Sequence, residues 1–330
     1  PPLLLDHAKQ MGVLAGVIQF DGAPRSLEHC LPMLRVMRDN TSSPSPHSTT
    51  LEGVSFAYAS LLAPPESFDE KTPLLSDKPS LLFVGDVRLD NREELFLALG
   101  HATKTLNKTS DSELILAAYQ QWGEKCPSKL LGAFAFVIWD PQKQEAFCAR
   151  DHMGIKPFYY WRNQNTFLFA SEIKGLLAFP SVPQKVNEEK IADYLFLSLQ
   201  DKEITFYQDI FRLPPAHFMR VSSGSLHKHQ YWSLSPNNEL KLARNSDYIE
   251  QFKEIFTEAV HCRMRTKAKV GSHLSGGLDS SSVSCMIRKI RDEREESQPV
   301  STFSVIYPET PQSDESKFID IVLNQGGYDP

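Results

Sequence analysis

The sequence predicts two domains of different classes, an α+β domain with antiparallel sheets followed by the beginning of a parallel α/β sheet. The first two thirds of the 330 residues alternate short apolar runs with turn residues, the pattern of paired antiparallel strands. The last third alternates helices with strands, as parallel sheets do. A polar segment separates the two patterns. We therefore expect a first domain over 11–235, a linker over 236–246 and a second domain over 247–330.

Strand and hairpin signals dominate the first domain. Residues 13–20 are apolar and run into an Asp-Gly-Ala-Pro turn, and residues 80–89 predict a further strand. Two apolar runs within 132–151 are joined by Pro-Gln-Lys-Gln and predict a hairpin. Residues 157–172 repeat this pattern around Arg-Asn-Gln-Asn. Ser, Thr and Pro between 40 and 50 predict an irregular, disordered loop.

Helices are expected between these strands. Residues 26–38 have apolar positions at helical spacing. Asn91 with Glu94, and Ser110 with Glu113, have the spacing of a capping box, in which the side chains of the two residues bond to each other's backbone amides. Each pair predicts the start of a helix that a glycine ends.

The second domain opens with a predicted helix over 248–265, capped by Asp247 and Glu250. The elements expected after it are a strand at 269–274, a loop, a helix ending near 296, a strand at 300–306 and a helix at 314–327. Two strands with three helices bury little apolar surface and would be marginal alone. We therefore expect the chain to be a fragment or a natural truncation.

The composition argues against several classes of protein. Hydrophobic residues at 41% and aromatic residues at 10% are enough for packed cores. A net charge of -6 argues against nucleic acid as the main partner. No apolar run approaches the ~18–20 residues of a membrane span, and the first residues do not form a signal peptide. Five cysteines without a CxxC pair predict reduced thiols in a cytoplasmic protein.

Residues 273–283, HLSGGLDSSSV, join a predicted strand to a predicted helix. Such a turn binds phosphate well, because glycine lets the backbone approach an oxyanion and the helix N-terminus adds partial positive charge. Hydroxyls of Ser275, Ser280 and Ser281 can donate hydrogen bonds, and Asp279 can hold a divalent cation. Neither a Walker motif nor GxGxxG is present. The alternative is a Ser/Gly turn that caps the helix and binds nothing.

The loop resembles the pyrophosphate loop of the ATP-pyrophosphatase superfamily and, within it, of the asparagine synthetase family. Motifs of the first domain resemble that family's N-terminal class II glutamine amidotransferase domain, and they are, in order, MGVLAGVIQFDG, VRLDNREEL, SDSELILAAYQQWG, LLGAFAFVIWD, ARDHMGIKPFYYW, FASEIKGLL and ITFYQDIFRLPPAHF. The resemblance implies an Ntn-hydrolase-like domain followed by the N-terminal part of a PP-loop domain. It also implies ATP and Mg²⁺, used by a ligase that adenylates a carboxylate before a nitrogen nucleophile attacks.

The resemblance assigns the pyrophosphate cradle to consecutive residues, namely Ser275, Gly276, Gly277, Leu278, Asp279, Ser280 and Ser281. Asp279 is the expected Mg²⁺ ligand. Val305 falls where the family's backbone meets the adenine, and a core valine explains that residue equally well. No catalytic residue can be named, because the family's Gly-rich Asp-Glu segment and its lysine would lie beyond Pro330.

The glutamine-hydrolysing half departs from the family pattern. Gly12, after Met11, stands where the family has the cysteine whose own α-amine acts as the base. Ser60 replaces the arginine that clamps the glutamine carboxylate, and Val84-Gly85 replaces the Asn-Gly pair of the oxyanion hole. The resemblance therefore predicts that glutamine hydrolysis is lost.

Two further residues of this half have alternative interpretations. Asp111 matches the position that would hold the glutamine amine, but it also fits a residue that only starts a helix. Cys30, the first cysteine, lies in a predicted helix and is expected to be a core residue.

The leading hypothesis is an ATP-dependent, amide-forming ligase that acts on a small-molecule or peptide carboxylate, with ammonia or an amine as nucleophile. One alternative is an intramolecular cyclase, similar to the cysteine-less β-lactam synthetases and lasso-peptide cyclases. Another is a non-catalytic, truncated pseudoenzyme. A homodimer is compatible with the family. Enzymes of the superfamily that modify nucleotides do not carry this N-terminal half.

Overall fold

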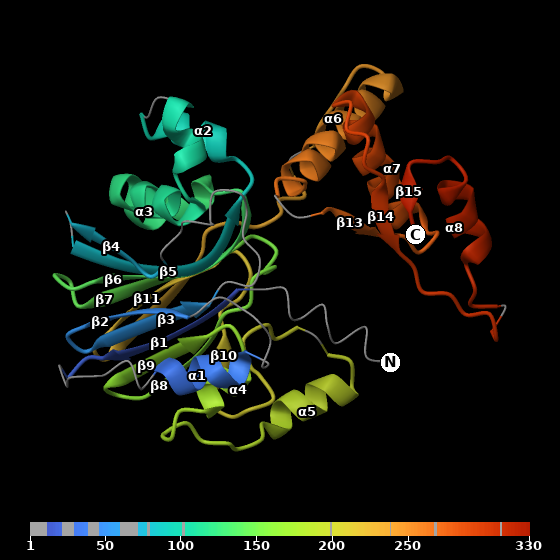
Figure 1. Cartoon of the computed structure of the whole chain (residues 1–330). Coiled ribbons are helices and arrows are strands. Elements are labelled where there is room, and N and C mark those ends of the chain that lie inside the picture. Colours follow the sequence, from blue (N-terminus) through green and yellow to red (C-terminus); the bar gives the residue numbers. More distant parts are fainter. Residues whose placement is uncertain are drawn as a thin grey trace. The chain divides into compact units, whose positions relative to one another are not determined.

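The computed structural model describes residues 12–21, 30–38, 46–59, 72–77, 80–100, 103–198, 200–237, 239–266, 269–310 and 312–330. The chain divides into two compact units, Pro1–Leu234 and Ser235–Pro330 (Figure 1).

Two antiparallel sheets form the centre of the first unit. In order across the first sheet, the strands are β10 (Ile210–Arg212), β8 (Tyr159–Arg162), β9 (Thr166–Ala170), β1 (Val13–Gln19), β3 (Val54–Ala59) and β2 (His47–Leu51). In order across the second, they are β12 (Ser225–Gln230), β11 (His217–Ser222), β7 (Glu145–Arg150), β6 (Gly132–Asp140), β5 (Ser80–Leu89) and β4 (Leu74–Asp77). The predicted α+β class with antiparallel sheets is confirmed.

Helices cover the outer face of each sheet, so that the unit has four layers (Figure 1). The helices on the first sheet are α1 (Cys30–Met37) and α4 (Ile173–Leu177), and those on the second are α2 (Arg92–Ala98) and α3 (Asp111–Trp122). Further elements are α5 (Glu188–Leu195) and the 3-10 helices η5 (Thr103–Lys108) and η6 (Gly123–Lys129).

The central strands are buried on both faces, which explains their nearly continuous apolar sequence. In β6, Phe136 and Ile138 point to the helical layer, whereas Val137 and Trp139 point between the sheets. The core between the sheets therefore depends on residues that alternate within single strands.

The second unit is a small parallel α/β sheet. Its helices are α6 (Asn245–Arg263), α7 (Leu278–Glu293) and α8 (Ser316–Leu323), and its strands, in order, are β13 (Gly271–His273), β14 (Val300–Phe303) and β15 (Tyr328–Asp329). Both pairings are parallel, and that of β13 with β14 was predicted. The third strand was not expected from the sequence, because two residues after a Gly-Gly pair carry no strand signal.

One of the predicted capping boxes of the first unit is confirmed and the other is wrong. At the start of α3, Glu113 N donates to Ser110 Oγ at 3.2 Å, and Ser110 N donates to the Glu113 carboxylate at 2.7 Å. Asn91 does not cap α2 in this way. Its side chain instead accepts from Leu131 N at 2.9 Å, so that it ties α2 to the start of β6.

Two further boundaries differ from prediction. Helix α6 begins at Asn245 rather than at 248. The Asp247 carboxylate, in the first turn, accepts from Arg244 N at 3.2 Å and thus caps the start of the helix. The predicted loop at 40–50 contains β2 from His47 onward, which pairs with β3. The first residues of that loop, 40–45, and of the predicted helix, 26–29, lie outside the described residues.

Candidate functional site

The predicted phosphate loop connects β13 to α7. Strand β13 ends at His273, and α7 begins at Leu278 with Gly277 as its N-cap residue. The loop therefore lies at the carboxyl end of a parallel strand, which is where ligands bind in open α/β sheets. The structure places all the predicted cradle residues, 275–281, in this loop and the first turn of α7.

Hydroxyl groups within the loop hold its shape. Ser280 Oγ accepts a hydrogen bond from Ser275 N at 3.1 Å and lies 2.9 Å from Ser275 Oγ. It also lies within donating distance of Gly277 O, at 3.2 Å. Ser281 Oγ is buried and has no hydrogen-bond partner among the described residues. Two of the three serines thus position the backbone, and the third keeps its hydrogen-bonding capacity unused.

The two glycines of the loop have different roles. Gly276 has φ +83°, and a side chain there would place Cβ 2.9 Å from Phe318 Cβ and 3.2 Å from Glu315 O. Gly276 therefore permits both the left-handed backbone and the close approach of α8. Gly277 has φ −70°, and its Cβ would meet only Ser275 Oγ at 3.4 Å. The backbone conformation and the packing of α8 therefore require glycine at position 276 but not at position 277.

Asp279 lies exposed in the first turn of α7, where a carboxylate is favourable. Among the described residues there is no group of three or more His, Cys, Asp or Glu side chains that could hold a metal. The single carboxylate of Asp279 suits Mg²⁺, which proteins bind through one or two carboxylates together with waters and substrate phosphates. It does not suit a cation held by a complete cage of protein ligands.

Val305 follows β14 on the same edge of the sheet. Ser304 Oγ donates to Leu274 O at 2.7 Å, which ties the segment after β14 to the segment after β13. The Val305 side chain is 63% exposed, so it does not belong to the core of the described residues. Contact of its backbone with adenine stays a prediction.

A side chain at Gly12 would meet the ends of two neighbouring side chains, although Gly12 also lines a pocket of about 520 Å³. A Cβ at this position would lie 2.5 Å from Tyr58 Oη and 3.0 Å from Asp86 Oδ1. Asp86 is buried and forms an ion pair with Lys156 at 2.7 Å. Burial raises the pKa of the Asp86 carboxyl, while the charge of Lys156 lowers it. The Tyr58 hydroxyl and the carboxylate of a buried ion pair thus lie on one side of Gly12, and a pocket opens beside it.

Lys156 is placed by a clamped turn between β7 and β8. The Asp151 carboxylate, fully buried, accepts from Ile155 N at 2.8 Å and from Lys156 N at 2.9 Å. Arg150 Nε donates to Lys156 O at 2.6 Å. Sequence reasoning missed Tyr58, Asp86 and Lys156. A signal was available in the charged residues of ARDHMGIKP, which stand between two buried strands.

Two further positions that the resemblance assigns to a glutamine site, Val84 and Asp111, are buried. Val84 is fully buried between the two sheets. Asp111 is 1% exposed; its carboxylate accepts from Leu89 N at 2.8 Å and pairs with the buried Arg92. Both carboxylate oxygens are therefore bonded within the protein. Met11 and Ser60 lie outside the described residues.

Cys30, the first cysteine of the chain, is a core residue and not a nucleophile. Cys30 is fully buried and its Sγ donates to Ser55 O at 2.9 Å, which confirms its prediction as a core residue. Burial raises the pKa of the Cys30 thiol to about 12, so the thiolate that attacks substrates does not form there.

Comparisons with known proteins agree with both units. A family model described as "Glutamine amidotransferase domain" matches residues 66–232, and one described as "Asparagine synthase" matches residues 251–330. The chain thus combines a glutamine amidotransferase domain with part of an asparagine synthase domain. No helix in the described residues is long and apolar enough to cross a membrane.

Curated relatives identify the family. Asparagine synthetase [glutamine-hydrolyzing] 3 of Bacillus subtilis is 32% identical over 234 residues, which cover 71% of this chain and 37% of that protein. Asparagine synthetase [glutamine-hydrolyzing] 2 of the same organism is 30% identical over 322 residues, covering 92% of this chain and 41% of that protein. Amidase chry2 of Gibberella zeae is 37% identical over 186 residues, covering 54% of this chain and 26% of that protein. The chain belongs to the asparagine synthetase family, and it spans less than half the length of these relatives.

Proposed function

We propose that this chain is part of an ATP-dependent carbon–nitrogen ligase, in which residues 275–281 hold the pyrophosphate portion of Mg-ATP. The observation that carries the proposal is the loop itself, which lies at the carboxyl edge of a parallel sheet and opens helix α7. Bound ATP would adenylate a carboxylate and release pyrophosphate. Asp279 would hold Mg²⁺, and the backbone at Val305 would meet the adenine.

In this proposal the first unit does not hydrolyse glutamine. Support comes from Gly12, which has no nucleophilic side-chain atom, and from Tyr58 and Asp86, whose side chains lie close to it. Asp111 supports it too, because its carboxylate is bonded to Leu89 and Arg92. The nitrogen nucleophile would then be free ammonia or an amine of the substrate.

The packing around Gly12 also favours a second candidate, namely amide formation within one substrate. An enzyme that closes an amide in a peptide or amino-acid derivative needs no ammonia, and therefore no glutaminase. The carboxylate that is activated would belong to a small molecule or a peptide. We further propose that the protein acts in the cytoplasm and as a homodimer.

Exchange of labelled pyrophosphate into ATP tests the ligase proposal in the whole protein that carries this chain. We expect exchange that depends on a carboxylate, with aspartate and peptide carboxylates as the first compounds. Asp279→Ala should abolish it. Asp292→Ala is the matched control, because Asp292 lies exposed in the same helix and pairs with Arg288. Absence of exchange with every carboxylate, or unchanged exchange in Asp279→Ala, would contradict the proposal and favour a non-catalytic scaffold.

Nitrogen donors separate the two candidates. An external-ammonia ligase should form product only when ammonium is added, whereas an intramolecular cyclase should form it without ammonium. Neither should release glutamate from glutamine. Measurable release of glutamate by the purified protein would overturn the assignment of an inactive glutaminase site.

A further inference from the structure

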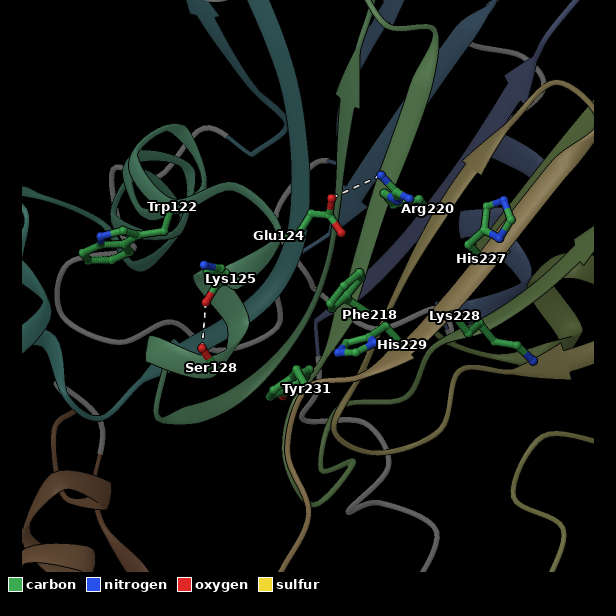
Figure 2. A pocket seen from close by; sticks show the side chains of 10 residues that line it. All are labelled: Trp122, Glu124, Lys125, Ser128, Phe218, Arg220, His227, Lys228, His229 and Tyr231. Atoms are coloured by element: carbon green, nitrogen blue, oxygen red, sulfur yellow. Dashed lines mark hydrogen bonds and ion pairs between the residues drawn. The ribbon is translucent and has the colours of Figure 1, made fainter.

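A pocket of about 700 Å³ opens on the first unit, away from the Gly12 region. It lies between the end of α3 with η6 on one side and the strands β11 and β12 on the other (Figure 2). The residues that line it are Trp122, Glu124, Lys125, Ser128, Phe218, Arg220, His227, Lys228, His229 and Tyr231. Its volume is in the range of small-molecule sites, about 300–1,000 Å³.

Aromatic rings form part of the lining. Phe218 is buried, and its ring centroid lies 5.1 Å from that of His229 on the neighbouring strand. Tyr231 is held in place because its hydroxyl donates to Arg150 O at 2.8 Å. Trp122 stands on the opposite wall (Figure 2). These rings offer flat apolar surfaces on which a planar group can pack.

The charge of the lining is positive, although the whole chain carries -6. The lining holds the cations Lys125 and Arg220 and one carboxylate, Glu124, which accepts only from Nη1 of Arg220, at 3.1 Å. Among the described residues, Lys125 Nζ and the other guanidinium nitrogens of Arg220 have no hydrogen-bond partner. Lys228 does not add to this charge, since its ammonium pairs with Glu203, outside the lining.

Arg220 lies beside the ring surface, on the strand that carries Phe218, whereas Lys125 lies on the opposite wall (Figure 2). Arg220 lies directly across the β11–β12 pairing from His227, and Phe218 lies across from His229. The cation is therefore two residues from the aromatic floor on the same face of β11. A ligand that spans this distance needs a ring next to an anionic group.

We infer that this pocket binds a small molecule that combines a planar aromatic ring with a carboxylate. The ring packs against the exposed His229, which Phe218 supports from below. The carboxylate lies between the two walls, where it accepts hydrogen bonds from the free side of the Arg220 guanidinium and from Lys125. Arg suits this partner because its planar fork matches both carboxylate oxygens. Glu124 limits the affinity, because it competes for Arg220. This inference is independent of the ligase proposal.

Calorimetric titration of the 330-residue chain with 2-naphthoate tests the inference, with 2-naphthalenemethanol as the neutral compound of the same ring. We expect 2-naphthoate to bind at least about tenfold more tightly, because charged hydrogen bonds contribute more than neutral ones. Arg220→Gln and Lys125→Gln should each weaken binding about fivefold or more. Glu124→Gln should strengthen it. Lys143→Gln, which removes an exposed lysine of the β6–β7 turn, should leave it unchanged.

Three results would overturn the inference: no binding of 2-naphthoate at millimolar concentration, equal binding of the neutral compound, or equal binding by Lys125→Gln and Lys143→Gln. Circular dichroism checks that each variant folds. Lys125 and Lys143 are both exposed, so this pair stays informative even where Arg220→Gln is unstable.

Discussion

The two units of the chain differ in the size of their apolar clusters and in the residues at their candidate sites. The first has three apolar clusters in four layers, with large side chains such as Trp139 and Phe134 almost fully buried, and two positions that the resemblance assigns to a glutamine site are buried too. The described part of the second has two small clusters and leaves Phe252 and Ile255 more than half exposed. Its predicted phosphate loop is nevertheless held by hydrogen bonds of Ser275 and Ser280, while Ser281 Oγ has no partner among the described residues. The large apolar clusters and the predicted phosphate loop thus belong to different units.

This contrast has a physical explanation. The first unit is held by apolar residues that lie between and outside its sheets, so its stability rests mainly on these clusters. The shape of the phosphate loop depends instead on contacts within a few residues, namely those of Ser280 and the approach of α8 to Gly276.

The largest expected effect is on the stability of the first unit. Asp111→Asn should destabilise it by about 3–5 kcal/mol, because it leaves the Arg92 guanidinium buried without its counter-charge. All four tryptophans lie before residue 235, so urea unfolding followed by their fluorescence reports on this unit. Lys143→Gln should stay within about 0.5 kcal/mol of the wild type. A similarly small change for Asp111→Asn would show that Asp111 is free for ligand binding.

Filling the space at Gly12 should have the next largest effect. Gly12→Ala should cost about 1–3 kcal/mol, since its Cβ would overlap Tyr58 Oη. The cost should fall in the background of Tyr58→Phe, which removes that hydroxyl, and urea unfolding of the four variants measures the coupling. Additivity within about 0.5 kcal/mol would mean that Tyr58 does not block this site.

The loop glycines give a smaller, local effect in the second unit. Gly276→Ala should cost about 1–2 kcal/mol, because alanine disfavours positive φ, and the clash with Phe318 adds to that cost. Hydrogen exchange should then become faster in α8. Gly277→Ala is the matched control and should leave the exchange of α8 unchanged. Equal effects of the two substitutions would show that α8 does not set the shape of the loop.

The smallest expected effect is a pH dependence at His152, which lies against the rings of Tyr231 and Trp232. Burial lowers the pKa of His152, and the charge of Asp151 partly opposes this. A base whose pKa is lower in the folded state stabilises the fold above its unfolded pKa of about 6.5 and loses this contribution as the pH falls. Melting temperatures between pH 7.5 and 5.5 should fall less for His152→Gln than for the wild type. Identical slopes would exclude this role.

Much of the fold could be predicted from sequence because its signals are local. Ser110 and Glu113 form the predicted capping box, and the parallel pairing of β13 with β14 follows from alternating helices and strands. Asn91 failed as a cap because it bonds to Leu131, forty positions away in the chain, which no local pattern reveals. The same holds for β15, whose two residues become a strand only through pairing with β14.

In the candidate sites, too, residues adjacent in the sequence could be predicted and residues from separate segments could not. The phosphate loop is contiguous, so its residues could be named from the sequence. Tyr58, Asp86 and Lys156 come from three separate segments and converge on Gly12 only in the folded unit. The 63% exposure of Val305 likewise depends on where β14 ends, which the apolar sequence over 300–306 concealed.

Binding of Mg-pyrophosphate tests the central claim most directly, because this probe needs the loop and not the rest of an ATP site. Calorimetry with the 330-residue chain should show binding that requires Mg²⁺. Gly277→Ala should keep this binding, and Gly276→Ala should lose it. In Asp279→Asn, Mg²⁺ should no longer strengthen the binding of pyrophosphate. Pyrophosphate bound no more tightly than sulfate, or bound equally by Gly276→Ala and Gly277→Ala, would contradict the assignment of residues 275–281 as a pyrophosphate cradle.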